Sequence, residues 1–186
     1  MLSQKGTSLV ELLIAMTLFG VIMAAVTNAY TLQRRTLAVQ EQVNLMTAQA
    51  QTSMDLLSRE IRAAGTNPFG IALTAVTYDV NQLRLQSDHN GDGDILDADE
   101  DVIYRFDAAN RRLLRDSGTG NEVVADNIEL FQWTYLDQNG NPTTSSAAIK
   151  QLDMTIRSRT ARPDRRYTQN GGYRTYTLTS RIGLHN

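Results

Sequence analysis

The sequence predicts an α+β fold, in which one long N-terminal α-helix packs on an antiparallel β-sheet. Three patterns predict this class. Residues 7–30 contain an apolar run with a single charge, residues 31–65 continue a helical period of 3.6 residues, and beyond Gly65 the period changes to two. A helix with one apolar face and strands with alternating faces bury these surfaces against each other, which gives the α+β arrangement.

Residues 9–26 form an apolar run that is long enough to cross a membrane. They read LVELLIAMTLFGVIMAAV, and Glu11 is the only charged residue among them. A helix of this length rises about 27 Å, close to the roughly 30 Å of a hydrocarbon core. A charge inside such a segment costs roughly 2.5–3.5 kcal/mol, so Glu11 requires a physical reason. The preceding polar leader, residues 1–6, is very short and contains Lys5, which suits the cytoplasmic side of a membrane.

A cut after Gly6 would give Glu11 such a reason. The chain would then begin at Thr7, and its new amino group would lie one helical turn from the Glu11 carboxylate. A buried carboxylate is tolerated where a cation neutralises it, and the amino terminus of a neighbouring subunit is a candidate cation. A secretory signal peptide and a plain membrane anchor are the alternatives for this segment, and the anchor leaves Glu11 without a purpose.

Residues 31–65 form the amphipathic half of the same predicted helix. Apolar residues recur there at steps of three or four, whereas the opposite face carries polar residues that include Glu60. Gly65 and Pro68 are stop signals for a helix. We therefore expect a helix over residues 7–64, with its first half in lipid or a filament core and its second half packed on a globular domain. The apolar positions are Val39, Val43, Met46, Ala50, Met54, Leu57, Ile61 and Ala64.

Residues 66–186 are expected to form a periplasmic or extracellular β-sheet domain. Alternation such as Ile103 and Arg105 against Tyr104 and Phe106 is typical of a half-buried strand. The segments 107–111 and 137–141 are rich in Asp and Asn and are predicted turns, and 161–172 is a predicted polar loop. The predicted strands are residues 74–80, 82–86, 101–106, 112–115, 128–136, 152–158 and 173–182.

A run of acidic residues between two predicted strands has the spacing of a calcium-binding loop. Residues 88–99 read DHNGDGDILDAD. In a twelve-residue calcium loop, oxygen ligands come from positions one, three, five, seven and twelve, and a glycine at position six allows a sharp turn. Gly93 falls at position six, and hard oxygen ligands suit Ca²⁺. The residues at the ligand positions are Asp88, Asn90, Asp92, Asp94 and Asp99.

Two features of this loop depart from the usual calcium pattern. Position twelve is Asp99 instead of the usual glutamate, although Glu100 can substitute for it with a shift of register. Predicted strands flank the loop where helices are usual, so Ca²⁺ would have a structural role there. The alternative is a solvated acidic hairpin loop without a metal.

The N-terminal segment KGTSLVELL, residues 5–13, resembles the cleavage and methylation motif of type IV prepilins and pseudopilins. The resemblance implies that a prepilin peptidase cuts between Gly6 and Thr7, that Thr7 becomes N-methylated, and that Glu11 guides assembly into a filament. Thr7 stands where many members of the superfamily have Phe. Later segments resemble PilW-type minor pilins and the J-type minor pseudopilins of type II secretion, namely residues 57–65, 102–106, 112–115, 124–129 and 176–182.

Other classes of function have less support in the sequence. The chain has no Cys, only two His and a net charge of −2, so thiolate chemistry is excluded and neither a catalytic residue nor a general nucleic-acid surface is expected. One basic and aromatic patch is a candidate contact for DNA or for a partner subunit, and a simply hydrated loop is the alternative. The patch consists of Arg162, Arg165, Arg166 and Tyr167.

Together these features predict a minor type IV pilin of the PilW type that initiates or caps pilus assembly. We expect a single-pass inner-membrane precursor with a periplasmic domain, which joins other minor and major pilins through its N-terminal helix and so reaches the pilus at the cell surface. Ca²⁺ is the only cofactor expected. A J-type minor pseudopilin is the nearest alternative. A membrane-tethered calcium-dependent adhesin or DNA-binding module is the alternative from another class.

Overall fold

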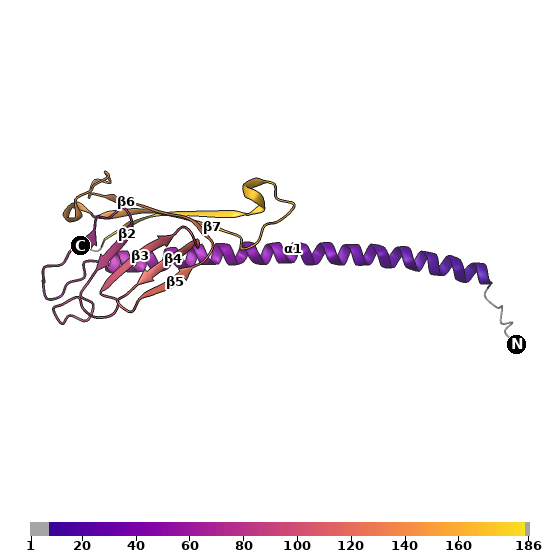
Figure 1. Cartoon of the computed structure of the whole chain (residues 1–186), viewed down its shortest axis with the longest axis horizontal. Helices are drawn as coiled ribbons and strands as arrows, with labels where there is room; N and C mark the ends of the chain where they lie inside the picture. The colour runs from indigo at the N-terminus through magenta and orange to yellow at the C-terminus, as the bar shows by residue number, and fades with distance from the viewer. Residues whose placement is uncertain (1–7, 185–186) are drawn as a thin grey trace. The chain divides into compact units, whose positions relative to one another are not determined.

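The computed structural model describes residues 8–184, which form one long helix and two antiparallel sheets (Figure 1). The chain divides into two compact units, the second of which begins at Gln42. Helix α1 (Leu9–Ala63) belongs to both units. The strands are β1 (Val76–Thr77), β2 (Gln82–Gln86), β3 (Asp101–Asp107), β4 (Arg112–Asp116), β5 (Asn121–Ala125), β6 (Ile128–Leu136), β7 (Gln151–Arg159) and β8 (Thr175–Gly183), with short 3₁₀ helices η1 (Ser146–Ala148) and η2 (Gln169–Gly172).

Helix α1 ends where the sequence predicts. The Ala64 amide still donates to the Glu60 carbonyl at 2.8 Å, and Gly65 then adopts a φ of 88°. This left-handed conformation is one that glycine adopts without a Cβ clash, so the helix stops there. The Gly65 amide donates instead to the carbonyl of Gln86 in β2 at 2.9 Å, which ties the helix end to the sheet.

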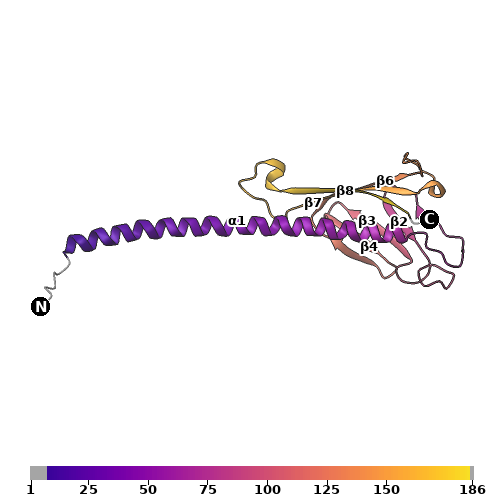
Figure 2. The ribbon, with the colours of Figure 1, turned by 180° about the vertical axis from the view of Figure 1, so that it is seen from behind.

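The second half of α1 buries the apolar face predicted from its period. Its six apolar positions from Met46 to Ala64 are each no more than 4% exposed, and Val43 is half-buried. Five of them, from Ala50 to Ala64, pack in one core with apolar residues of both sheets. Figures 1 and 2 show this part of the helix lying alongside both sheets, with β6, β7 and β8 above it in either view. The predicted α+β class is confirmed.

The strands form two sheets, where the sequence analysis expected one. The first has the order β1-β2-β3-β4-β5 and the second the order β6-β7-β8, and all neighbours are antiparallel. Asn127, between β5 and β6, marks the change of sheet. Its φ is 57°, which asparagine tolerates better than most residues, and its carbonyl accepts a bond from the Arg159 amide at 2.9 Å. After Asn127 the chain therefore leaves the first sheet, and β6 pairs with β7 in the second.

The predicted strands differ most from the structure at three places. The predicted strand 74–80 shortens to β1 because the amides of Tyr78 and Asp79 donate to the side chains of Ser146 and Tyr135. The last strand begins at Thr175 because the Tyr173 amide completes the turn of η2. β5 was not predicted at all. It is an edge strand whose first three residues are exposed, so it lacks the alternation of a half-buried strand.

Candidate functional site

The first candidate site is the apolar surface of α1 before Glu41. Its large apolar side chains between Leu9 and Val26 are 48–74% exposed. Among the described residues, α1 is the helix that is long and apolar enough to cross a membrane. An uncovered apolar surface of this extent marks a site of contact with a membrane or a protein.

Glu11 lies in the first turn of α1, where its carboxylate has a helix-capping role. The Ser8 amide donates to Glu11 Oε2 at 3.4 Å, and the Ser8 carbonyl accepts the first helical bond from Leu12 at 3.1 Å. This is half of a capping box, and the negative charge also suits the positive end of the helix dipole. The predicted cleavage and methylation residues, Gly6 and Thr7, lie outside the described residues.

The threonine hydroxyl groups along this part of α1 are satisfied within the helix. Thr17, Thr27, Thr31 and Thr36 each donate to a carbonyl three or four residues earlier, at 2.8–3.1 Å. Their polar atoms therefore need no partner from outside, which suits a surface that is to be buried in an apolar environment.

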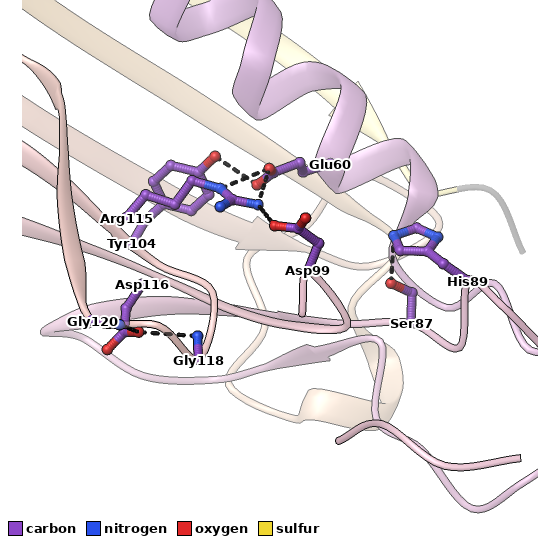
Figure 3. A network of polar contacts seen from close by, with 9 residues as sticks. All are labelled: Glu60, Ser87, His89, Asp99, Tyr104, Arg115, Asp116, Gly118 and Gly120. Atoms are coloured by element: carbon purple, nitrogen blue, oxygen red, sulfur yellow. Dashed lines mark hydrogen bonds and ion pairs between the residues drawn. The ribbon is translucent and has the colours of Figure 1, made fainter. Parts of the chain in front are cut away.

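A polar network joins the end of α1 to the five-stranded sheet (Figure 3). The Tyr104 hydroxyl donates to Glu60 Oε2 at 2.5 Å, and Arg115 donates to Glu60 Oε1 through Nε at 2.9 Å. Arg115 Nη2 also donates to Asp99 Oδ1 at 2.6 Å. The helical period placed Glu60 on the solvent-facing side, but its side chain is only 19% exposed. Its carboxylate therefore clamps the helix onto β3 and β4.

The protonation states of this network follow from burial and charge. Burial and the neighbouring Glu60 carboxylate raise the pKa of the Tyr104 hydroxyl, so it keeps its proton and donates. Burial acts to lower the pKa of Arg115, but its bonds to Asp99 and Glu60 outweigh burial and raise that pKa. The Glu60 carboxylate therefore accepts one hydrogen bond from the neutral Tyr104 hydroxyl and another from the cationic Arg115 guanidinium.

The second candidate site is the acidic loop between β2 and β3, where the predicted calcium ligands lie in different surroundings. Asp88 is buried, and its Oδ1 accepts the Gly91 amide at 2.6 Å. Asn90 and Asp92 are exposed, and the Asn90 amide group donates to Asp92 Oδ2 at 3.0 Å. Asp94 is exposed and accepts the Leu96 amide at 2.8 Å.

The surroundings of Asp99 and Glu100 differ from those that the spacing predicts. Asp99 has a φ of 71°, and its carboxylate pairs with Arg115. Glu100 is 1% exposed and lies with Asp92 and Asp97, where one oxygen from each carboxylate is within 4.8 Å of the others. Glu100, and not Asp99, therefore lies with the other acidic side chains of the loop. Asp97, absent from the predicted ligand set, is brought in by the turn at residues 97–100.

Hydrogen bonds and like charges shift the acidity of the exposed members. The Asp94 amide and the Asn90 side chain hold the pKa of Asp92 below its usual range. The negative charge of Asp92 is the largest cause of a raised pKa at Asp97. The two carboxylates therefore repel each other in this loop.

The third candidate site, the basic and aromatic patch, lies in the loop between β7 and β8. The ring of Tyr167 is covered by the Arg174 guanidinium at 5.0 Å, and Arg174 also pairs with Asp164 at 3.0 Å. The aromatic face that would stack on a base is therefore already in use. The exposed cations of the patch are Arg162, Arg165 and Arg166.

Comparison with known families finds one match. Residues 1–27 match the family model of the prokaryotic N-terminal methylation motif. The match contains Gly6, Thr7 and Glu11, and it supports a type IV pilin or pseudopilin. No curated protein matches the chain. The implied interactions of such a protein are with a prepilin peptidase and with other pilins, and the apolar helix fits a membrane-anchored pilin.

Proposed function

We propose that this protein is a minor type IV pilin of the PilW type, which initiates or caps the assembly of a pilus. The observation that carries the proposal is the exposed apolar segment of α1, which coincides with the methylation motif. The segment serves first as the membrane anchor of the precursor and then as the surface that packs against the helices of other pilins.

The balance of free energies favours burial of this segment despite its one carboxylate. Twelve large apolar side chains between Leu9 and Val26 are exposed. Removing each from water contributes about 1.5–3 kcal/mol. The carboxylate of Glu11 costs only roughly 2.5–3.5 kcal/mol in an apolar segment. Lipid or neighbouring helices can therefore cover the segment without removal of Glu11.

In this mechanism Glu11 selects the register of the incoming subunit. A buried carboxylate is stable where a cation lies against it, and the methylated amino group of Thr7 on a neighbouring subunit supplies that cation after cleavage. Small residues let the helices approach closely around the pair. These residues are Ala15, Gly20, Ala24 and Ala25.

The assignment to a minor pilin rests on the resemblance of the later segments, and it extends to J-type minor pseudopilins. Both proteins carry the same N-terminal motif and differ in the filament that they join. Deletion of the gene, followed by complementation, separates the two. Loss of surface pili with normal protein secretion supports the minor pilin, whereas loss of secretion with normal piliation supports the pseudopilin.

Replacement of Glu11 tests the assembly mechanism itself. Glu11→Ala should leave the protein in the inner-membrane fraction and reduce its recovery in sheared filaments at least tenfold. Glu41→Ala is the matched control, because Glu41 is exposed on the same helix beyond the apolar segment. Equal recovery of both variants in filaments would contradict the mechanism. Normal filaments with lost adhesion would indicate a tethered adhesin instead.

A further inference from the structure

Carboxylates in and next to the loop between β2 and β3 differ in whether an arginine pairs with them. Asp99 and Asp101 pair with arginines, Asp99 with Arg115 at 2.6 Å and Asp101 with Arg84. Asp92, Asp97 and Glu100 have no arginine or lysine partner in the described part of the chain, and their oxygens lie together. The fold therefore neutralises the first group and leaves the second as a compact anionic cluster.

The buried member of this cluster is incompletely satisfied. Glu100 is 1% exposed, and its Oε1 accepts the amides of His89 and Asn90 at 2.9 and 3.3 Å. Its Oε2 is buried and has no hydrogen-bond partner among the described residues. Asp88, which is fully buried, likewise has an unpartnered Oδ2. Buried carboxylate oxygens are normally paired or bound to a metal, so the unpartnered oxygen of Glu100, which belongs to the cluster, points to a cation as its partner.

The exposed members converge on the same place. The Asn90 side-chain nitrogen donates to Asp92 Oδ2 at 3.0 Å and to Asp97 Oδ2 at 2.6 Å, so one donor atom contacts both carboxylates. One oxygen from each of Asp92, Asp97 and Glu100 lies within 4.8 Å of the others, and carboxylates this close repel each other. A divalent cation between them would remove this repulsion.

We propose that this loop binds one Ca²⁺ through the carboxylates of Asp92, Asp97 and Glu100. The chemistry favours Ca²⁺, because all the donors are oxygen and come from a glycine-containing loop that can supply more than six of them. Mg²⁺ requires a tighter octahedral arrangement and retains its water more strongly. Asp94 and Asp99, which the twelve-residue spacing would include, are not ligands in this site.

The ion would also stabilise the contacts of Arg115 with Glu60 and Asp99 at the end of α1. Glu100 follows Asp99 directly, and Asp99 contacts Arg115, which contacts Glu60 of the helix. Figure 3 shows Asp99 against Arg115 and Arg115 against Glu60. Holding Glu100 therefore holds Asp99 against Arg115. The proposal stands apart from filament assembly, because it concerns only the unit that begins at Gln42.

Calcium titration of the purified full-length chain in detergent tests this site. The protein is first stripped with a chelator, then titrated with CaCl₂ or MgCl₂ and followed by calorimetry and native mass spectrometry. We expect one Ca²⁺ per chain with a dissociation constant below about 1 mM, and at least tenfold weaker binding of Mg²⁺. Saturating Ca²⁺ should raise the Tm by roughly 5–10 °C. Absence of binding at millimolar Ca²⁺, or equal binding of both ions, would overturn the proposal.

Paired variants identify the ligands. Glu100→Gln and Asp92→Asn should each weaken Ca²⁺ binding at least tenfold, whereas Asp99→Asn and Asp94→Asn should bind within threefold of the wild type. The reverse order would overturn the proposed ligand set. Circular dichroism without Ca²⁺ checks that each variant folds. If Glu100→Gln does not fold, the exposed Asp92 decides the question, because its replacement disturbs no packing.

Discussion

At the scale of single residues, Glu60 shows how one side chain joins two elements that are distant in the sequence. Its carboxylate receives a neutral donor from β3 and a cation from β4. The helical period cannot reveal such a role, because it records only whether a position is apolar. Tyr104 and Arg115 become visible as partners only when the strands are in register, where they lie opposite each other.

Removal of the Tyr104 hydroxyl should measure the strength of this clamp. Tyr104→Phe keeps the buried ring and removes the donor to Glu60, so we expect the free energy of unfolding to fall by about 1–3 kcal/mol. Denaturant unfolding followed by the fluorescence of Trp133, the only Trp in the chain, provides the measurement. Tyr167→Phe is the control, because its hydroxyl donates to the side chain of Gln169 in an exposed loop. Equal losses for the two variants would contradict a special role for the clamp.

Residue-level prediction of the sites was partial for similar reasons. The sequence identified Glu11 because a carboxylate in an apolar run is conspicuous, and it identified the acidic loop because the spacing of its oxygen donors is regular. It did not place Asp97 in that loop's cluster or Asp99 on Arg115. Those positions depend on the turn at residues 97–100 and on a contact with β4, neither of which is encoded in the spacing.

At the scale of elements, the sequence predicted those strands that bury one face in the core. Strands β2 and β6 have the predicted bounds. β5 was missed, because an exposed edge strand is under no such constraint. The division into two sheets was also missed. It depends on the backbone conformation of Asn127 and on which strand pairs with β7, and local alternation is the same in either arrangement.

The two faces of α1 beyond Gln42 should respond differently to truncation. Leu57→Ala opens a cavity at a fully buried position in the core shared by both sheets, and we expect a loss of about 2–5 kcal/mol in the free energy of unfolding. Leu45→Ala removes the same atoms from a position on the same helix that is 60% exposed. We expect a change of less than about 0.5 kcal/mol there.

Thermal or denaturant unfolding of both leucine variants in detergent checks this prediction. A large loss at Leu45 would mean that the solvent-facing side of α1 is packed against something within the isolated chain. A small loss at Leu57 would contradict the assignment of the helix face to the core.

At the scale of the whole molecule, the two units have different relations to their surroundings. The unit that begins at Gln42 has its own core, which joins one helix face and two sheets. The helix before it exposes its apolar side chains and has no such core within the described residues. We infer that the function of such a protein depends on the membrane or protein that covers its exposed apolar helix. The proposed function assigns that role to the membrane before assembly and to other pilins afterwards.

The mass of the mature protein tests this account most directly. Intact-mass and N-terminal peptide spectra of the protein isolated from its native cells should show a chain that begins at Thr7, lacks residues 1–6 and carries one added methyl group. A mature chain that still begins at Met1, or one released into solution by a cut near Ala25, would contradict the assignment to a filament subunit.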